Sequence, residues 1–153
     1  MNIQKTISKE KLEQLLKSFE DFDRHGHSVE ELQSLLAMLY WSGFRISEII
    51  GRLPHKTVSE WKGTHYTPAW PPILKEQMWR DADTQALFVR LPARKQWRKD
   101  RLIQIPLGLE FVDMIVKQWE KTAEQSPVWK ISSITWWRIL QALLKPLDPS
   151  GLV

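Results

Sequence analysis

The sequence has no cysteine among its 153 residues, and this absence excludes disulfide bonds and thiolate metal sites. It also lacks any run of about 18 apolar residues, the length that a membrane-spanning helix needs, and its N-terminus has no apolar signal region. We therefore expect a cytoplasmic protein with no membrane partner. Apolar residues make up 42% and charged residues 26% of the chain, which is ordinary for one globular domain.

Histidine and tyrosine are scarce, and both are confined to the first 66 residues. The four histidines are His25, His27, His55 and His65, and the two tyrosines are Tyr40 and Tyr66. No His-x-x-x-His pair and no carboxylate cluster occupies one face of an expected helix. The sequence therefore gives no support to a metal-dependent hydrolase, and we expect neither a metal site nor a cofactor.

Charge is distributed unevenly along the chain, whose net charge is +4. Residues 1–50 carry six basic and eight acidic side chains, whereas the rest of the chain carries sixteen basic and ten acidic ones. A basic excess in one region is typical of a surface that binds a polyanion. An ordinary solvated surface can have the same bias, so charge alone does not decide between the two.

Hydrophobic periodicity and capping residues predict an α+β domain, mostly helical, over residues 1–153, with one small antiparallel sheet. The helices are expected at residues 8–22, 28–42, from 46 onward, 109–119 and 133–144, and the two strands at 86–89 and 102–105. Residues 51–72 contain four prolines and are typical of an insertion or extended loop. Residues 73–79 are expected to form one or two helical turns.

The segment between the two expected strands is strongly basic, which makes it the first candidate binding surface. Its only acidic residue is Asp100. Its basic residues are Arg90, Arg94, Lys95, Arg98, Lys99 and Arg101. We expect this hairpin to contact phosphate groups, with Arg94, Arg98, Lys99 and Arg101 as binding residues.

Three stretches together resemble the tyrosine recombinases, the family of phage integrases. They are LLAMLYWSGFRISEI at residues 35–49, the basic hairpin ending in KQWRKDRLIQIPL at 95–107, and PVWKISSITWWR at 127–138. In that family an apolar helix runs into a small-residue turn, then Arg, then Ile-Ser-Glu. The resemblance implies the N-terminal part of the recombinase catalytic domain, with double-stranded DNA as partner and a nucleoid association if the source is prokaryotic.

The resemblance also implies roles for individual residues. Arg45 matches the first arginine of the family, which stabilises charge on the attacked phosphate. Glu48, one helical turn further on, is expected to hold Arg45 in place. Lys95 is expected to be the general acid that protonates the leaving oxygen, with Lys99 as the alternative.

The chain departs from the family after the hairpin. The family needs His-x-x-Arg and a nucleophilic tyrosine there, and the sequence has no histidine or tyrosine after Tyr66. We expect that the chain alone is inactive, and that a missing C-terminal part or further recombinase protomers would supply these groups.

Two alternatives remain open at this point. Residues 46–61 resemble a helix-turn-helix DNA-binding module, with Thr57-Val58-Ser59 opening a recognition helix. A second alternative is a degenerate recombinase fold that serves only as an interaction fragment. A helix at residues 57–61 would favour the first of these.

Overall fold

The computed structural model describes residues 8–92 and 99–144, and it confirms the α+β class. The helices are α1 (Lys9–Ser18), α2 (Val29–Ser42), α3 (Ile46–Ile50), α4 (Val112–Lys121) and α5 (Ser133–Leu144). The strands are β1 (His55–Ser59), β2 (Gly63–Thr67), β3 (Met78–Asp81), β4 (Ala86–Leu91) and β5 (Arg101–Pro106). Short 3₁₀ turns occupy Phe19–Asp21 and Lys75–Gln77.

Side-chain caps fix the starts of the first two helices, and a glycine cap fixes the end of α2, where the sequence predicts them. Ser8 Oγ accepts a hydrogen bond from the Lys11 N–H, and Ser28 Oγ accepts one from the Glu31 N–H. Gly43 ends α2 in the left-handed conformation, with a φ of 70°. Such caps satisfy backbone groups that a helix leaves without partners, so they determine where each helix begins and ends.

The antiparallel sheet has three strands in the order β3-β4-β5, one more than the sequence predicts. In β4, Leu87, Val89 and Leu91 are buried, whereas Arg90 is exposed, so one face of the sheet covers the core. Met78 of β3 pairs with Val89, and β5 pairs with β4 along its length. The prediction of helical turns across residues 73–79 is wrong for residues 78–79, because pairing with β4 draws Met78–Asp81 into the sheet.

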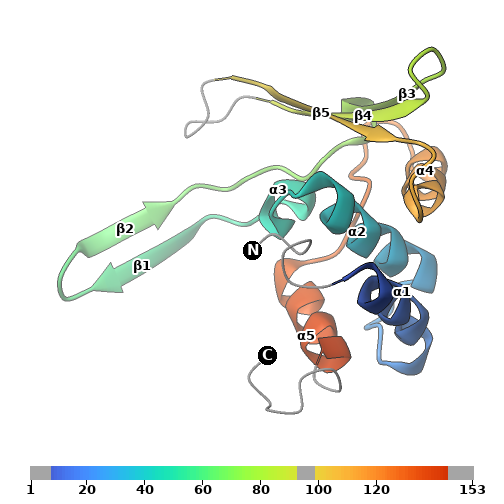
Figure 1. The fold of residues 1–153 in the computed structure, drawn as a ribbon. Coiled ribbons are helices and arrows are strands. Elements are labelled where there is room, and N and C mark those ends of the chain that lie inside the picture. The colour runs from blue at the N-terminus through green and yellow to red at the C-terminus, as the bar shows by residue number, and fades with distance from the viewer. Residues whose placement is uncertain (1–7, 93–98, 145–153) are drawn as a thin grey trace.

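Figure 1 shows the sheet at one end of the body and α5 toward the other, with α2 between them. The core beneath the sheet is formed by the apolar faces of the helices, including Leu35 and Leu36 of α2 and Ile115 of α4. α4 begins at Val112 rather than at residue 109, because Phe111 takes a left-handed conformation with a φ of 69°.

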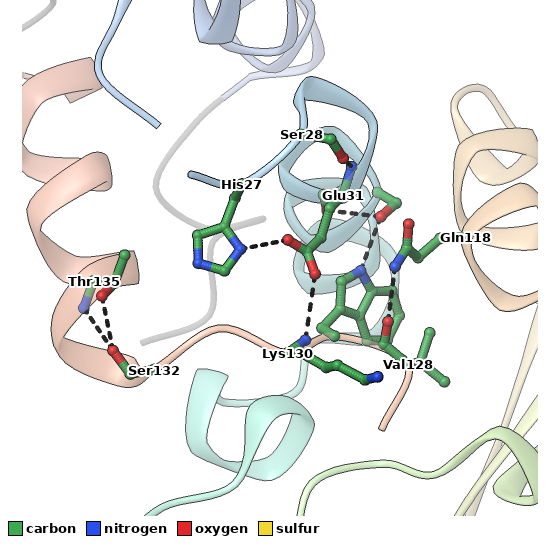
Figure 2. Close-up of polar contacts among 10 residues, drawn as sticks. His27, Ser28, Glu31, Gln118, Val128, Lys130, Ser132 and Thr135 are labelled. Atoms are coloured by element: carbon green, nitrogen blue, oxygen red, sulfur yellow. Dashed lines mark hydrogen bonds and ion pairs between the residues drawn. The ribbon is translucent and has the colours of Figure 1, made fainter. Parts of the chain in front are cut away.

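Polar contacts attach the start of α2 to the segment before α5 (Figure 2). Glu31 accepts hydrogen bonds from His27 Nδ1 at 2.5 Å and from the Lys130 N–H at 3.3 Å. The Trp129 indole N–H donates to Ser34 Oγ at 2.8 Å, and only 1% of Trp129 is exposed. This segment is therefore held by both burial and hydrogen bonds.

Residues 51–72 contain a β-hairpin that projects from the body, here called the ribbon (β1 and β2, with residues 60–62 as its tip) (Figure 1). β1 and β2 pair in register over five residue pairs, from His55 with Thr67 to Ser59 with Gly63. The helix-turn-helix alternative is wrong, because Thr57, Val58 and Ser59 lie in an extended strand. The β-prone residues of both segments favour the extended form.

Candidate nucleic-acid interface

Arg45 lies at the surface between two helices. The left-handed Gly43 turns the chain at the end of α2, and Phe44 then inserts into the core with 1% exposure. Arg45 follows in an extended conformation, with φ −74° and ψ 151°, immediately before α3. Its side chain is exposed, so the turn and the buried Phe44 together present this cation to the outside of the molecule.

Glu48 is buried beneath this arginine, with 3% of the residue exposed. Its Oε1 accepts a hydrogen bond from the Arg45 backbone N–H at 3.3 Å. Its Oε2 accepts one from Arg101 Nη1 at 2.6 Å. The expected Glu48–Arg45 contact is therefore made through the backbone, and the guanidinium on the carboxylate is that of Arg101. A buried carboxylate needs such partners, because it loses its hydration.

Arg101 is the first residue of β5, and it connects the basic hairpin to α3. Besides the ion pair with Glu48, its guanidinium carbon lies 5.0 Å from the centre of the Phe44 ring. The side chain keeps 38% of its surface exposed. The structure thus brings together three of the predicted site residues, Arg45, Glu48 and Arg101, although β5 lies more than fifty residues after α3.

Of the remaining charged residues of the basic hairpin, the structure describes Arg90, Lys99 and Asp100. Lys99 is described and exposed, two residues before Arg101. Asp100 forms an ion pair with Arg90 of β4, across the hairpin. Arg94, Lys95 and Arg98 lie outside the described residues. In the view of Figure 1, the edge of the sheet where β4 ends and β5 begins points toward the same side as the ribbon.

The ribbon is a candidate surface that the sequence does not predict. An open groove with a volume of about 850 Å³ lies near its base. The groove is lined by Pro54, His55, Lys56, His65, Tyr66, Thr67, Pro68 and Trp70. Two signals could have located the ribbon: Val, Thr and Tyr on either side of residues 60–62, and the Lys62-Gly63 turn.

Metal and membrane sites are not found in the part of the chain that the structure describes. Across residues 8–92 and 99–144, no group of three or more histidine or acidic side chains is placed to hold a metal ion. In those same residues, none of the helices has the length and the apolar character that crossing a membrane requires.

We compared the chain with protein-family models, with curated proteins and with solved structures, and none of these comparisons gives a match.

Proposed function

We propose that this chain is the DNA-binding part of a tyrosine-type site-specific recombinase, and that it contributes Arg45 and a hairpin lysine to phosphodiester strand exchange. The observation that carries the proposal is the contact of Glu48 with both Arg45 and Arg101. This contact attaches the motif arginine and the basic hairpin to one place on the surface, as a shared phosphate would require.

The chemistry needs two kinds of cation at one phosphate. A tyrosine oxygen attacks phosphorus and forms a 3′-phosphotyrosyl bond, while the bond to the 5′ oxygen breaks. Negative charge grows on the non-bridging oxygens, and the permanently charged guanidinium of Arg45 suits that position. The 5′ oxygen takes up a proton as it leaves, and we assign this donation to Lys95, with Lys99 as the alternative.

Glu48 and Arg101 serve as positioning residues in this proposal. The Glu48 carboxylate fixes the backbone at Arg45 and the start of β5 at the same time. Because Arg101 is also packed over Phe44, the base of the hairpin is held while its exposed residues remain available to DNA. The nucleophile and the His-x-x-Arg motif would come from a C-terminal part or from another protomer.

The proposal is tested by the salt dependence of duplex binding, measured by fluorescence anisotropy. Alanine at Arg94, Lys95, Arg98 and Lys99 removes up to four cations that can bind phosphate. The slope of log K against log salt concentration should fall by about one unit for each phosphate that is no longer neutralised. Adding Arg45→Ala to this variant should lower the slope once more.

A matched control removes the same charge elsewhere. Alanine at Lys11 and Lys17 of α1 and at Lys117 and Lys121 of α4 changes four exposed lysines. This control should keep a slope close to that of the parent. The proposal would be contradicted if the unchanged protein and the hairpin variant had equal salt slopes. It would also be contradicted if the control variant lowered the salt slope as much as the hairpin variant does. A parent chain that does not bind duplex would favour the non-catalytic interaction fragment.

A further inference from the structure

We propose that the ribbon is a second duplex-DNA contact, which lies in the groove of the DNA next to the phosphate bound at Arg45. This inference rests on the proposed function, because it extends the same DNA beyond the recombinase site. Its starting observation is that the ribbon stands clear of the body and buries no side chain in either strand. Packing in the described chain therefore does not explain the ribbon's side chains.

The base of the ribbon is held firmly to the body. Arg52 and Trp70 exchange two backbone hydrogen bonds, of 2.9 and 3.0 Å, and the Arg52 guanidinium lies 3.7 Å from the centre of the Trp70 ring. The Ile73 N–H then donates to the Ile49 carbonyl of α3. The ribbon is thus anchored on α3, the short helix that Arg45 immediately precedes, so DNA bound at Arg45 would pass near the ribbon.

The two faces of the ribbon follow from its register. One face carries His55, Thr57, Ser59, His65 and Thr67, all of which have side chains that are able to donate or accept hydrogen bonds. The other face carries Lys56, Val58, Thr64 and Tyr66. A face of hydroxyls and imidazoles suits base edges, which offer both donors and acceptors, and phosphate oxygens, which accept hydrogen bonds.

The charge of the ribbon favours nucleic acid over a protein partner. β1 and β2 contain no carboxylate, and the ribbon as a whole carries two lysines, Lys56 and Lys62, and one carboxylate, Glu60 at the tip. Of the exposed apolar side chains, Val58 and Tyr66 share one face with Lys56 and Thr64, and Trp61 lies at the tip, so polar side chains are interspersed with the apolar ones. Interfaces with DNA are positively charged and polar in this way.

The dimensions of the ribbon also fit duplex DNA. The major groove is about 12 Å wide and admits a two-stranded β-ribbon. Five residues of strand extend about 17 Å, which equals about five base pairs of duplex length. The ribbon should therefore lengthen the DNA that one protein molecule covers by about five base pairs.

A deletion that keeps the base of the ribbon tests this directly. Residues 53–69 are replaced by Asn-Gly, a two-residue turn that can join Arg52 to Trp70, because these two residues already form a hydrogen-bonded antiparallel pair. Titration of a long duplex gives the number of base pairs covered per protein. We expect this number to fall by about five, while binding itself persists through the hairpin.

A point variant, Lys56→Ala with Lys62→Ala, makes the test independent of the fold of the deletion variant. Both lysines are exposed, and the salt slope should fall by up to about two units.

An unchanged slope and an unchanged number of covered base pairs would overturn the inference, even if the parent binds DNA through the hairpin. A deletion that changes only the sedimentation of the protein would assign the ribbon to a second copy instead, and would also overturn it. A parent that binds no duplex would defeat the proposed function as well.

Discussion

The body and the ribbon are stabilised in different ways. The body buries apolar side chains from its helices and from one face of a sheet. Among residues 52–69, all within the described chain, not one is buried. The ribbon therefore depends on its own backbone hydrogen bonds and on its attachment at Arg52 and Trp70. An isolated two-stranded hairpin is only marginally stable in water, so the ribbon should open locally while the body stays folded.

The largest expected effect is in the body. Trp129→Ala leaves a cavity and removes the hydrogen bond that the indole donates to the Ser34 hydroxyl, so the free energy of unfolding should fall by about 3–5 kcal/mol. Urea denaturation followed by circular dichroism measures this change. Trp129→Phe, which keeps most of the volume but not the indole N–H, should cost less. Equal reductions for the two variants would mean that the hydrogen bond, and not the packing, dominates.

A smaller effect is expected at the junction between the two regions. Gly51 has a φ of 79° and a ψ of 179°, and a Cβ added there would lie 2.7 Å from the Trp70 carbonyl oxygen. Gly51→Ala should therefore cost about 1–3 kcal/mol in unfolding experiments. Gly63→Ala is the control, because its φ is also positive but no atom lies within 4 Å. A control that lowers global stability as much as Gly51→Ala would show that the ribbon unfolds together with the body.

The smallest effect is expected on the ribbon itself. Trp61 is 94% exposed, so Trp61→Ser should change the free energy of unfolding by no more than about 0.5 kcal/mol. Trp61 and Trp129 are the same residue type, one on the ribbon and one in the body. Thermal unfolding of Trp61→Ser and Trp129→Ala measures the two effects under the same conditions. If Trp61→Ser lowered the melting temperature substantially, the ribbon would have to contribute to the core.

Local signals in the sequence account for most of the helices. Apolar spacing with the caps Ser8, Ser28 and Gly43 predicts α1 and α2 within a few residues, because these signals act inside one segment. The sequence also predicts β4 and β5, as runs of β-prone apolar residues. β1, β2 and β3 are harder to predict, because these segments lack the regular alternation of apolar and polar residues that marks a half-buried strand. For β1 and β2 the β-prone residues and the Lys62-Gly63 turn are the available signals. What makes Met78–Asp81 a strand is its pairing with β4.

The candidate site is predictable only in part. The motif identifies Arg45 and Glu48 as neighbours, because they lie three residues apart at the start of a helix. The partner of the Glu48 carboxylate cannot be found this way, since Arg101 reaches it only after β5 has paired with β4. The roles of Arg94, Lys95 and Arg98 remain predictions from the sequence.

The contacts around Trp129 have a consequence for the order of folding during synthesis. Ser34 and Trp129 are separated by 95 residues, and Glu31 and Lys130 by 99. α1 and α2 can begin to form as soon as they leave the ribosome, but Ser34 of α2 lacks its buried tryptophan partner until residue 129 has emerged. Until then this part of α2 is exposed to water and to other chains. Closing such a long loop is also slow, so the last third of the chain sets the time at which the core becomes protected.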